Sequence, residues 1–316
     1  MDIAEKLRNA ASPLFTFELL PPLRGKGIEA NYKAIDNLLD FHPAYINVTC
    51  HASDAEYRTR PDGTYERRVT CKRPSCVSTA AAIKYKYGIE VVPHVICNGM
   101  DREDTENLLI DLDFLDIHNI FVLRGDQAGN RVFAPKGDGH THATQLMEQV
   151  NDLNAGRYLD ASLVNPRPMS FSMGVACYPE KHIEAPNMER DLHYLKEKVR
   201  LGARYAVTQM FFDNAKYKAF VKRCREEGID IPIVPGIKPV SSMRNLVLLP
   251  QTFNIDMPED LSRELLKCKT NEEARAVGVE WAIAQARDLM AFGVPGIHFY
   301  TMGESDNIRK ICEAVY

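Results

Sequence analysis

The sequence predicts an α/β protein folded as a single (β/α)₈ barrel. Short apolar runs rich in β-branched and aromatic residues alternate with helical patterns along the chain, which indicates a parallel sheet. Eight such units occur in 316 residues, a little more than the roughly 250 residues typical of the barrel. The rival, a doubly wound open sheet, usually carries a G-x-G-x-x-G fingerprint after its first strand, and this sequence has none. We therefore expect residues 1–316 to form one domain.

The eight predicted strands are short runs of apolar residues, several of them bounded by proline, glycine or charged residues. In chain order they are Leu14–Leu20, Tyr45–Thr49, Ile89–Cys97, Asn119–Leu123, Phe171–Tyr178, Tyr205–Phe211, Ile231–Pro235 and Gly296–Tyr300.

The clearest helical patterns place apolar residues three and four positions apart. They cover Asn31–Phe41, Glu103–Ile117, Met188–Gly202 and Glu272–Phe292, and Gly202 stands where a glycine often ends a helix. The stretch Asn151–Met169 is an unusually long helix-to-strand connection. Such connections lie at the amino-terminal rim of a barrel, so we expect an oligomer contact or a mobile loop there.

Composition excludes several classes of function. Lysine and arginine total 39 and aspartate and glutamate 43, which gives a net charge of −4 without a basic block. This balance argues against nucleic-acid or membrane-surface partners. The N-terminus has no signal-peptide pattern and no stretch approaches the ~20 apolar residues of a membrane span, so we expect a cytoplasmic protein whose eight cysteines are reduced. No metal site is predicted, because Asp138, His140 and His142 match no strong ligand pattern.

Polar and ionisable residues stand at the ends of nearly all the predicted strands. In a barrel, catalytic groups lie at the carboxyl ends of the strands and in the loops that follow them. Convergence from so many strands therefore predicts an active site at one rim. The residues concerned are Glu18, Thr49, His94, Arg124, Gly125, Asp126, Tyr178, His182, Gln209 and Tyr300.

Spacing alone leaves the roles of these residues open. Glu18 is flanked by apolar residues and prolines, where burial would raise its pKa and suit a general acid, but an ordinary ion-paired glutamate is equally compatible. His94, inside an apolar strand, is more typical of a core residue than of a catalyst. Gln209 needs a hydrogen-bond partner, which could be a heterocyclic ligand or the backbone.

Two further patterns favour ordinary structural roles when taken in isolation. Arg124-Gly125-Asp126 is most simply a surface turn with an arginine–aspartate pair. Asp191 and Lys198 lie seven residues apart on one side of a helix, where they could meet a ribose hydroxyl and a phosphate. A solvated helix edge is the simpler interpretation of that spacing.

The strand-end strings, taken together and in order, resemble the catalytic barrel of methylenetetrahydrofolate reductase. The resemblance runs from about Leu14 to the C-terminus, and the length is similar to that of the bacterial form, which lacks the regulatory domain of the eukaryotic enzyme. The strings are Phe17-Glu18-Leu19-Leu20-Pro21-Pro22, Asn47-Val48-Thr49, Pro93-His94, Leu123-Arg124-Gly125-Asp126, Tyr178-Pro179-Glu180 with His182, Thr208-Gln209-Met210-Phe211-Phe212-Asp213, Pro235-Gly236-Ile237-Lys238-Pro239 and His298-Phe299-Tyr300-Thr301.

The resemblance implies an FAD enzyme of one-carbon metabolism and methionine synthesis. It also implies a barrel that binds FAD without a Rossmann motif, which agrees with the absence of G-x-G-x-x-G from this sequence. It would reduce 5,10-methylenetetrahydrofolate to 5-methyltetrahydrofolate with NADH or NADPH by ping-pong hydride transfer. It assigns Glu18 as general acid and Asp126 as the carboxylate beside flavin and pterin. The implied FAD-binding residues are Thr49, His94, Arg124, Gly125, Asp126, His142, Ala143, Tyr178, His182, Asp191 and Lys198. The implied substrate-binding residues are Glu18, Gln209, Met243 and Tyr300, and a homo-oligomer is expected.

Some positions depart from the family pattern. Leu19-Leu20 replaces a usual aromatic pair, and Met243 stands where an aromatic residue often stacks on a ligand. Glu304 stands where bacterial relatives often carry an arginine that helps to bind folate, and this reversal of charge means that the resemblance identifies no residue for the glutamate tail. Two other functions stay open: an FAD barrel of the proline dehydrogenase type, and a flavin- or folate-binding subunit that exchanges electrons with a partner protein.

Overall fold

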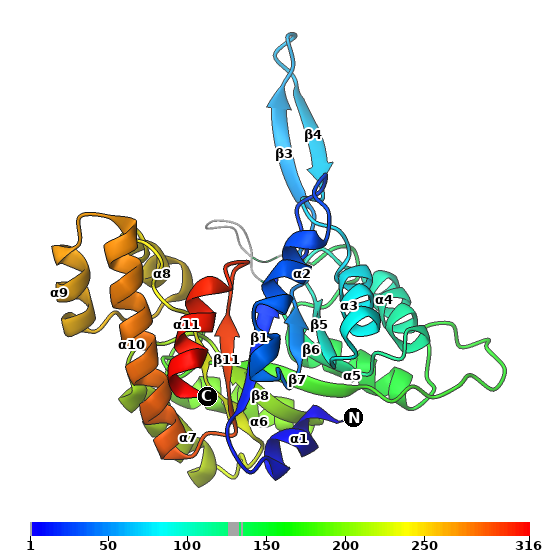
Figure 1. Ribbon diagram of the computed structural model, residues 1–316. Helices are drawn as coiled ribbons and strands as arrows, with labels where there is room; N and C mark the ends of the chain where they lie inside the picture. The colour runs from blue at the N-terminus through cyan, green and yellow to red at the C-terminus, as the bar shows by residue number, and fades with distance from the viewer. Residues whose placement is uncertain (1, 126–132, 134) are drawn as a thin grey trace.

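The computed structural model describes residues 2–125, 133 and 135–316, and it confirms the predicted barrel (Figure 1). All eight predicted runs contain a strand, and the neighbouring strands of the ring are parallel. The strands are β1 (Leu14–Leu19), β2 (Ile46–Val48), β5 (Val91–Ile96), β6 (Asn119–Leu123), β7 (Ser172–Cys177), β8 (Ala203–Thr208), β9 (Ile233–Val234), β10 (Gly236–Ile237) and β11 (Gly296–Tyr300).

The ring closes at Pro235, the last residue of the seventh predicted strand, which stands between β9 inside that prediction and β10 just beyond it. β9 pairs with β8 on one side, whereas β10 pairs with β11 on the other. Proline has no N–H to donate, but its carbonyl accepts a hydrogen bond from the N–H of His298 at 2.9 Å. The N–H of Gly236 donates to Oγ1 of Thr208 at 2.9 Å. One short segment therefore joins both ends of the sheet.

Most of the helices cover the outside of the ring. The helices are α2 (Glu29–Asp36), α3 (Cys76–Tyr87), α4 (Arg102–Phe114), α5 (Ala143–Asn154), α6 (Met188–Arg200), α7 (Asn214–Glu226), α8 (Asn245–Phe253), α9 (Glu259–Lys267), α10 (Asn271–Phe292) and α11 (Asp306–Val315). Of these, α8 reaches the carboxyl rim and α9 packs on α10. The expected helix to Phe41 was too long, because α2 ends at Asp36 and a separate 3₁₀ turn covers Leu39–Phe41. Between them, Asn37 donates to Oγ of Ser305 at 3.0 Å. No helix in the described ranges is long and apolar enough to cross a membrane.

The amino-terminal helix α1 (Ile3–Asn9) closes one end of the barrel. Its buried residues Ile3 and Leu7 pack against the interior side chains Tyr45 and Tyr205. The N–H of Ile3 donates to Oδ1 of Asn119, the first residue of β6, at 3.3 Å. Because α1 fills the amino-terminal end, a ligand has to approach from the carboxyl rim.

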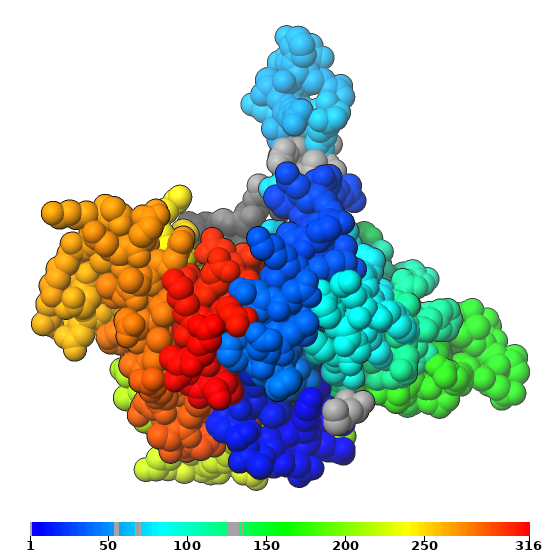
Figure 2. Space-filling model, in the orientation of Figure 1, coloured from blue at the N-terminus to red at the C-terminus, as the bar shows by residue number. Residues whose placement is uncertain are grey.

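An antiparallel hairpin, β3 (Asp54–Thr59) and β4 (Tyr65–Thr70), rises from the carboxyl rim as a long arm (Figures 1 and 2). The sequence analysis missed it, because these strands are rich in charged residues and were not apolar runs. A turn signal was nevertheless present in Pro61-Asp62-Gly63. Oδ1 of Asp62 accepts from the N–H of Thr64 at 2.9 Å.

The long connection before β7 begins later than expected, since α5 continues to Asn154 and the connection covers residues 155–171. Two contacts fix it to α4 at the amino-terminal end of the barrel. The N–H of Leu159 donates to Oε2 of Glu106 at 2.8 Å, and Arg167 pairs with Asp113. Within this connection the apolar residue Val164 is 86% exposed. The oligomer contact expected for the connection stays a prediction.

We predict that Gly278→Ala destabilises the protein by about 1–3 kcal/mol, because an added Cβ would overlap the backbone of Val240, lying 2.8 Å from its carbonyl carbon. Helix propensity alone predicts the opposite sign, a gain of about 1 kcal/mol. Urea unfolding measures the difference. Ala276→Gly, at an exposed position on the same helix, is the control and should cost about 1 kcal/mol. A stabilised Gly278→Ala variant would contradict the close approach.

Candidate active site at the carboxyl rim

A cavity of about 300 Å³ opens at the carboxyl rim, on the same side as the hairpin arm. Its walls come from the ends of strands all around the ring, so residues distant in sequence meet in one space. The predicted site residues that line it are Glu18, Thr49, His94, Arg124, Gly125, Tyr178, His182, Gln209 and Tyr300.

Glu18 and His94 meet on the wall formed by β1 and β5. Oε2 of Glu18 lies 3.4 Å from Nε2 of His94, and Nε2 is also 3.3 Å from Nδ2 of Asn47. Burial lowers the pKa of His94 to about 3, and the charges of His298 and His51 act in the same direction. The imidazole is therefore neutral at physiological pH, and its contact with the carboxyl group is not an ion pair.

Gln209 projects from the end of β8 into the same cavity. Its Oε1 accepts a hydrogen bond from the N–H of Met210 at 2.9 Å, which fixes the orientation of the amide plane. Its NH₂ group makes no hydrogen bond to any described residue. The backbone thus provides a hydrogen bond to the oxygen of this amide, and the NH₂ group is left to donate to a ligand.

Tyr300 forms a fixed wall of the cavity. Its hydroxyl donates to the carbonyl oxygen of Thr208 at 2.6 Å, and burial raises its pKa, so it stays protonated. Its ring lies over Gly236, where an added Cβ would be 2.6 Å from Cε2. Next to it, Oγ1 of Thr301 donates to the carbonyl oxygen of Glu18 at 2.6 Å. These bonds tie β11 to β1 and β8 around the cavity.

The opposite wall carries Arg124, Tyr178 and His182. Arg124 forms an ion pair with Glu184, and this bond lowers the pKa of the Glu184 carboxyl group. The rings of Tyr178 and His182 meet edge to face with centroids 4.7 Å apart. Burial lowers the pKa of His182 to about 4, and the charge of Arg124 lowers it further. The wall therefore combines one cation with a neutral aromatic pair.

Gly125 follows Arg124 with φ +85°, a conformation that side chains other than glycine rarely adopt. An added Cβ would also lie 3.1 Å from Cβ of Asn98. Glycine here lets a ligand approach the backbone closely. Asp126, the next residue and a predicted catalytic carboxylate, lies outside the described residues.

Asp191 and Lys198 lie behind the cavity wall and do not line it. Oδ2 of Asp191 accepts from the N–H of His182 at 2.9 Å, and Nζ of Lys198 donates to the carbonyl oxygen of Ala176 at 2.9 Å. Burial raises the pKa of Asp191 and lowers that of Lys198. The solvated helix edge favoured by their spacing was wrong, because both side chains turn inward and hold the segment after β7.

Three further predicted residues lie outside the cavity. His142 and Ala143 stand at the start of α5, where the N–H of His142 donates to Oε1 of Gln145 at 3.2 Å. Met243 is 38% exposed in the loop after β10, and its N–H donates to Oδ1 of Asn271 at 3.3 Å.

Several lining residues were missed by the sequence analysis. Cys50 and His51 directly follow Thr49, and Asn98 follows the third predicted strand, so the rule of strand ends would have found all three. Nε2 of His51 lies 2.8 Å from Oγ1 of Thr49. Phe253, at the end of α8, had no such signal, because folding alone brings that helix over the rim.

This arrangement suits a planar heterocyclic ligand better than a metal ion. It offers a buried carboxyl group, an amide donor, a cation and aromatic walls around one space. Throughout the described ranges, no group of three histidine, cysteine, aspartate or glutamate side chains is placed to hold a metal.

We predict that stability falls as the pH is lowered below about 6.5, because unfolded histidine takes up a proton there. His94 and His298 keep a pKa of about 3 in the folded protein, since both are buried. Their contribution is complete above pH ~6.5 and is lost towards pH ~3, at about 1.4 kcal/mol per pH unit for each residue. Urea unfolding between pH ~5 and ~7 measures the slope.

The variant His298→Gln should reduce the slope of the unfolding free energy against pH by about 1.4 kcal/mol per pH unit, because one histidine fewer takes up a proton on unfolding. His193→Gln, at an exposed position on α6, is the control and should leave the slope unchanged. Equal slopes in His298→Gln and the unsubstituted protein would show that His298 titrates normally in the folded state.

The comparisons with a family model and with related sequences agree on one family. Residues 3–316 match the family model described as methylenetetrahydrofolate reductase. The chain is 30% identical to the 5,10-methylenetetrahydrofolate reductase of Pectobacterium carotovorum subsp. carotovorum, over 95% of this chain and 89% of the relative. It is 29% identical to methylenetetrahydrofolate reductase (NADH) 1 of Arabidopsis thaliana over 96% of this chain, and it spans about half (48%) of that relative's length.

Among solved structures, the chain is similar to a protein from Clostridium thermocellum described as uncharacterized and as binding two copies of 5-methyl-5,6,7,8-tetrahydrofolic acid. The TM-score is 0.63, the sequence identity 14%, and the match covers 98% of this chain and 97% of the other. This likeness supports the barrel fold.

Proposed function

Because the chain belongs to the methylenetetrahydrofolate reductase family, we propose that it reduces 5,10-methylenetetrahydrofolate to 5-methyltetrahydrofolate with NADH or NADPH. The observation that carries the proposal is the meeting of Glu18 from β1 and Gln209 from β8 in one cavity. We further propose that residues 1–316 act as a single catalytic domain in cytoplasmic one-carbon metabolism and methionine synthesis, within a homo-oligomer.

Gln209 and Glu18 would act on the folate. The fixed amide of Gln209 presents its NH₂ group to the acceptor edge of the pterin. Glu18 acts as the general acid that protonates a ring nitrogen as the imidazolidine ring opens to a cationic iminium. The neighbouring His94 is neutral, so it adds no positive charge against that cation. Tyr300 shapes the wall, while Met243, outside the cavity, contributes at most from the rim.

The residues present also fit an FAD site. Arg124 can pair with phosphate, and Gly125 lets a flat ring approach the backbone. Thr49, His94, Tyr178 and His182 complete the lining, and Asp191 and Lys198 position the segment that carries His182. His142 and Ala143 would contact the cofactor from the start of α5. When bound, FAD supplies hydride transfer from the nicotinamide and then to the folate, which is a ping-pong sequence.

Asp126 is proposed as the carboxylate that stabilises the cationic iminium. In the sequence it directly follows Gly125, which lines the cavity.

We expect the purified protein to be yellow, to bleach anaerobically with NADH or NADPH alone, and to regain its colour when methylenetetrahydrofolate is added. Absorption spectroscopy follows both half-reactions. A folate-binding subunit without reductase activity would not bleach with pyridine nucleotide. A protein of the proline dehydrogenase type would not be reoxidised by the folate. A colourless protein that takes up no FAD would end the proposal.

We predict that Glu18→Gln slows folate reduction by about 10²–10⁴-fold, because the amide cannot donate the proton, while bleaching by pyridine nucleotide is retained. Stopped-flow absorption measures each half-reaction separately. Glu106→Gln is the matched control, since Glu106 is also buried but binds the connection before β7. Equal slowing of both half-reactions in Glu18→Gln would contradict the general-acid role.

A further inference from the structure

A second cavity, of about 100 Å³, adjoins the candidate active site. The two cavities share Tyr300 and Met302 as lining residues. The second one lies between the segment after β10, the end of β11 and the start of α11, and we call it the polar pocket. It is lined by Lys238, Pro239, Ser241, Tyr300, Thr301, Met302, Glu304, Asn307 and Ile308.

Lys238 is the positive charge of the polar pocket. It is partly buried directly after β10, yet its Nζ makes no hydrogen bond or ion pair within 4 Å to the described part of the chain. Burial lowers its pKa, and the more distant charge of Glu304 opposes that effect. A partly desolvated ammonium group without a close partner is unfavourable unless a ligand supplies an anion.

Asn307 provides a second, independent sign of a ligand. Its side chain is only 6% exposed, it lines the polar pocket, and its amide makes no hydrogen bond to the residues that the structure describes. Asn307 lies in the first turn of α11, a ten-residue helix whose N-cap, Ser305, makes no side-chain capping bond. The free N–H groups and the dipole of a helix start favour an anion at this end.

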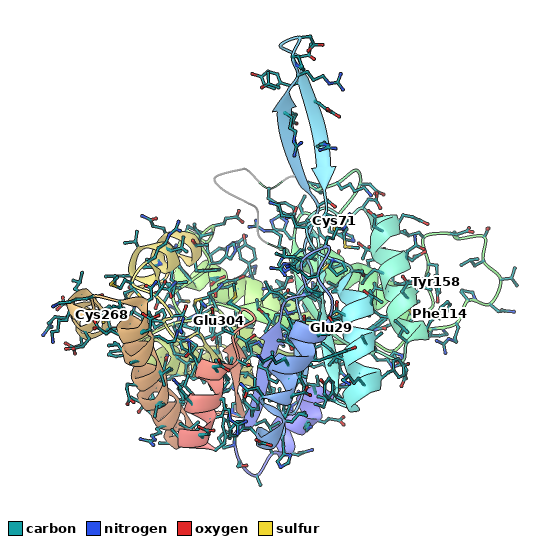
Figure 3. All side chains as sticks on the ribbon, turned by 45° about the horizontal axis from the view of Figure 1, so that its top comes forward. Glu29, Cys71, Phe114, Tyr158, Cys268 and Glu304 are labelled. Carbon is teal, nitrogen blue, oxygen red and sulfur yellow. The ribbon has the colours of Figure 1, made fainter. Side chains whose placement is uncertain are left out.

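Glu304 makes the polar pocket selective. This residue, labelled in Figure 3, comes from the turn between β11 and α11, and its carboxylate has no hydrogen bond to a described side chain. A bare anion would be repelled by it, so the matching ligand needs an N–H donor as well as a carboxylate. An amide-linked amino acid has both groups.

We propose that the polar pocket binds the glutamate tail of the folate, with Lys238 and Asn307 holding a carboxylate and Glu304 accepting the N–H of the benzamide link. The inference rests on the proposed function and adds residues for the tail. At about 100 Å³ the polar pocket has a third of the volume of the main cavity, so we assign the tail to it and the larger pterin to the main cavity. The position beside Tyr300 lets the pterin occupy the main cavity at the same time.

The test compares methylenetetrahydrofolate with methylenetetrahydropteroate, which lacks the glutamate, in steady-state assays of the flavin-loaded protein. Lys238→Met should raise KM for the folate by about 10- to 100-fold, the loss expected for one charge-assisted hydrogen bond. It should leave KM for the pteroate and bleaching by pyridine nucleotide unchanged. Lys238→Arg should retain most of the affinity, and Lys222→Met, on the exposed surface of α7, is the control.

A titration of 5-methyltetrahydrofolate, followed by the flavin spectrum, gives the dissociation constant without turnover and should show the same ratio. Glu304→Gln, at an exposed position, provides a second variant. It should weaken binding of the folate and strengthen binding of the pteroate, because the pteroate carries a benzoate carboxylate where the folate carries the amide N–H. Unchanged folate affinity in both Lys238→Met and Glu304→Gln would overturn the inference while leaving the proposed function intact. Failure of the unsubstituted protein to reduce either substrate would overturn the proposed function itself.

Discussion

Closure of the barrel at Pro235 is the constraint on which the rest of the structure depends. β9 and β10 are each two residues long, and each pairs with a different neighbour, so the segment around Pro235 joins β8 to β11. Without that junction β11 would lose one of its two partners, and the rim would open between Gln209 and Tyr300. The hydrogen bond from Tyr300 to the carbonyl oxygen of Thr208 spans the same junction. The cavity therefore exists because the ring is closed.

The interior below the cavity is filled by apolar and aromatic side chains, and burial among them sets the charge state of its histidines. Tyr45 and Tyr205 pack there against α1, and within the described residues their hydroxyl groups have no hydrogen-bond partner. In such surroundings ionisation is unfavourable, which keeps His94 and His298 neutral. The histidine next to Glu18 and the histidine beneath the cavity therefore carry no charge at neutral pH.

Sequence patterns predicted the eight strands and the polar residues at most strand ends of the cavity, because both follow from local rules. Apolar runs mark buried parallel strands, and the residues after them must meet at one rim, as Glu18, His94 and Gln209 do. The rules failed where tertiary packing decides. Spacing could not show that Asp191 faces inward to bind the N–H of His182, nor that Phe253 from α8 reaches the cavity. The hairpin escaped notice because its strands are rich in charged residues and are not apolar runs.

The same junction that closes the ring also places Lys238. Because β10 pairs with β11, the residue that follows β10 lies beside the turn that follows β11, although 66 positions separate Lys238 from Glu304 in the sequence. A comparison with the family pattern at one position at a time shows only that residue 304 is negatively charged. It suggests that the contact between folate and the usual arginine is lost. The fold shows that a cation enters the same pocket from the neighbouring strand. The charge of this pocket thus depends on residues that follow both paired strands, β10 and β11. A substitution after one strand therefore has to be judged together with the residues that follow the other.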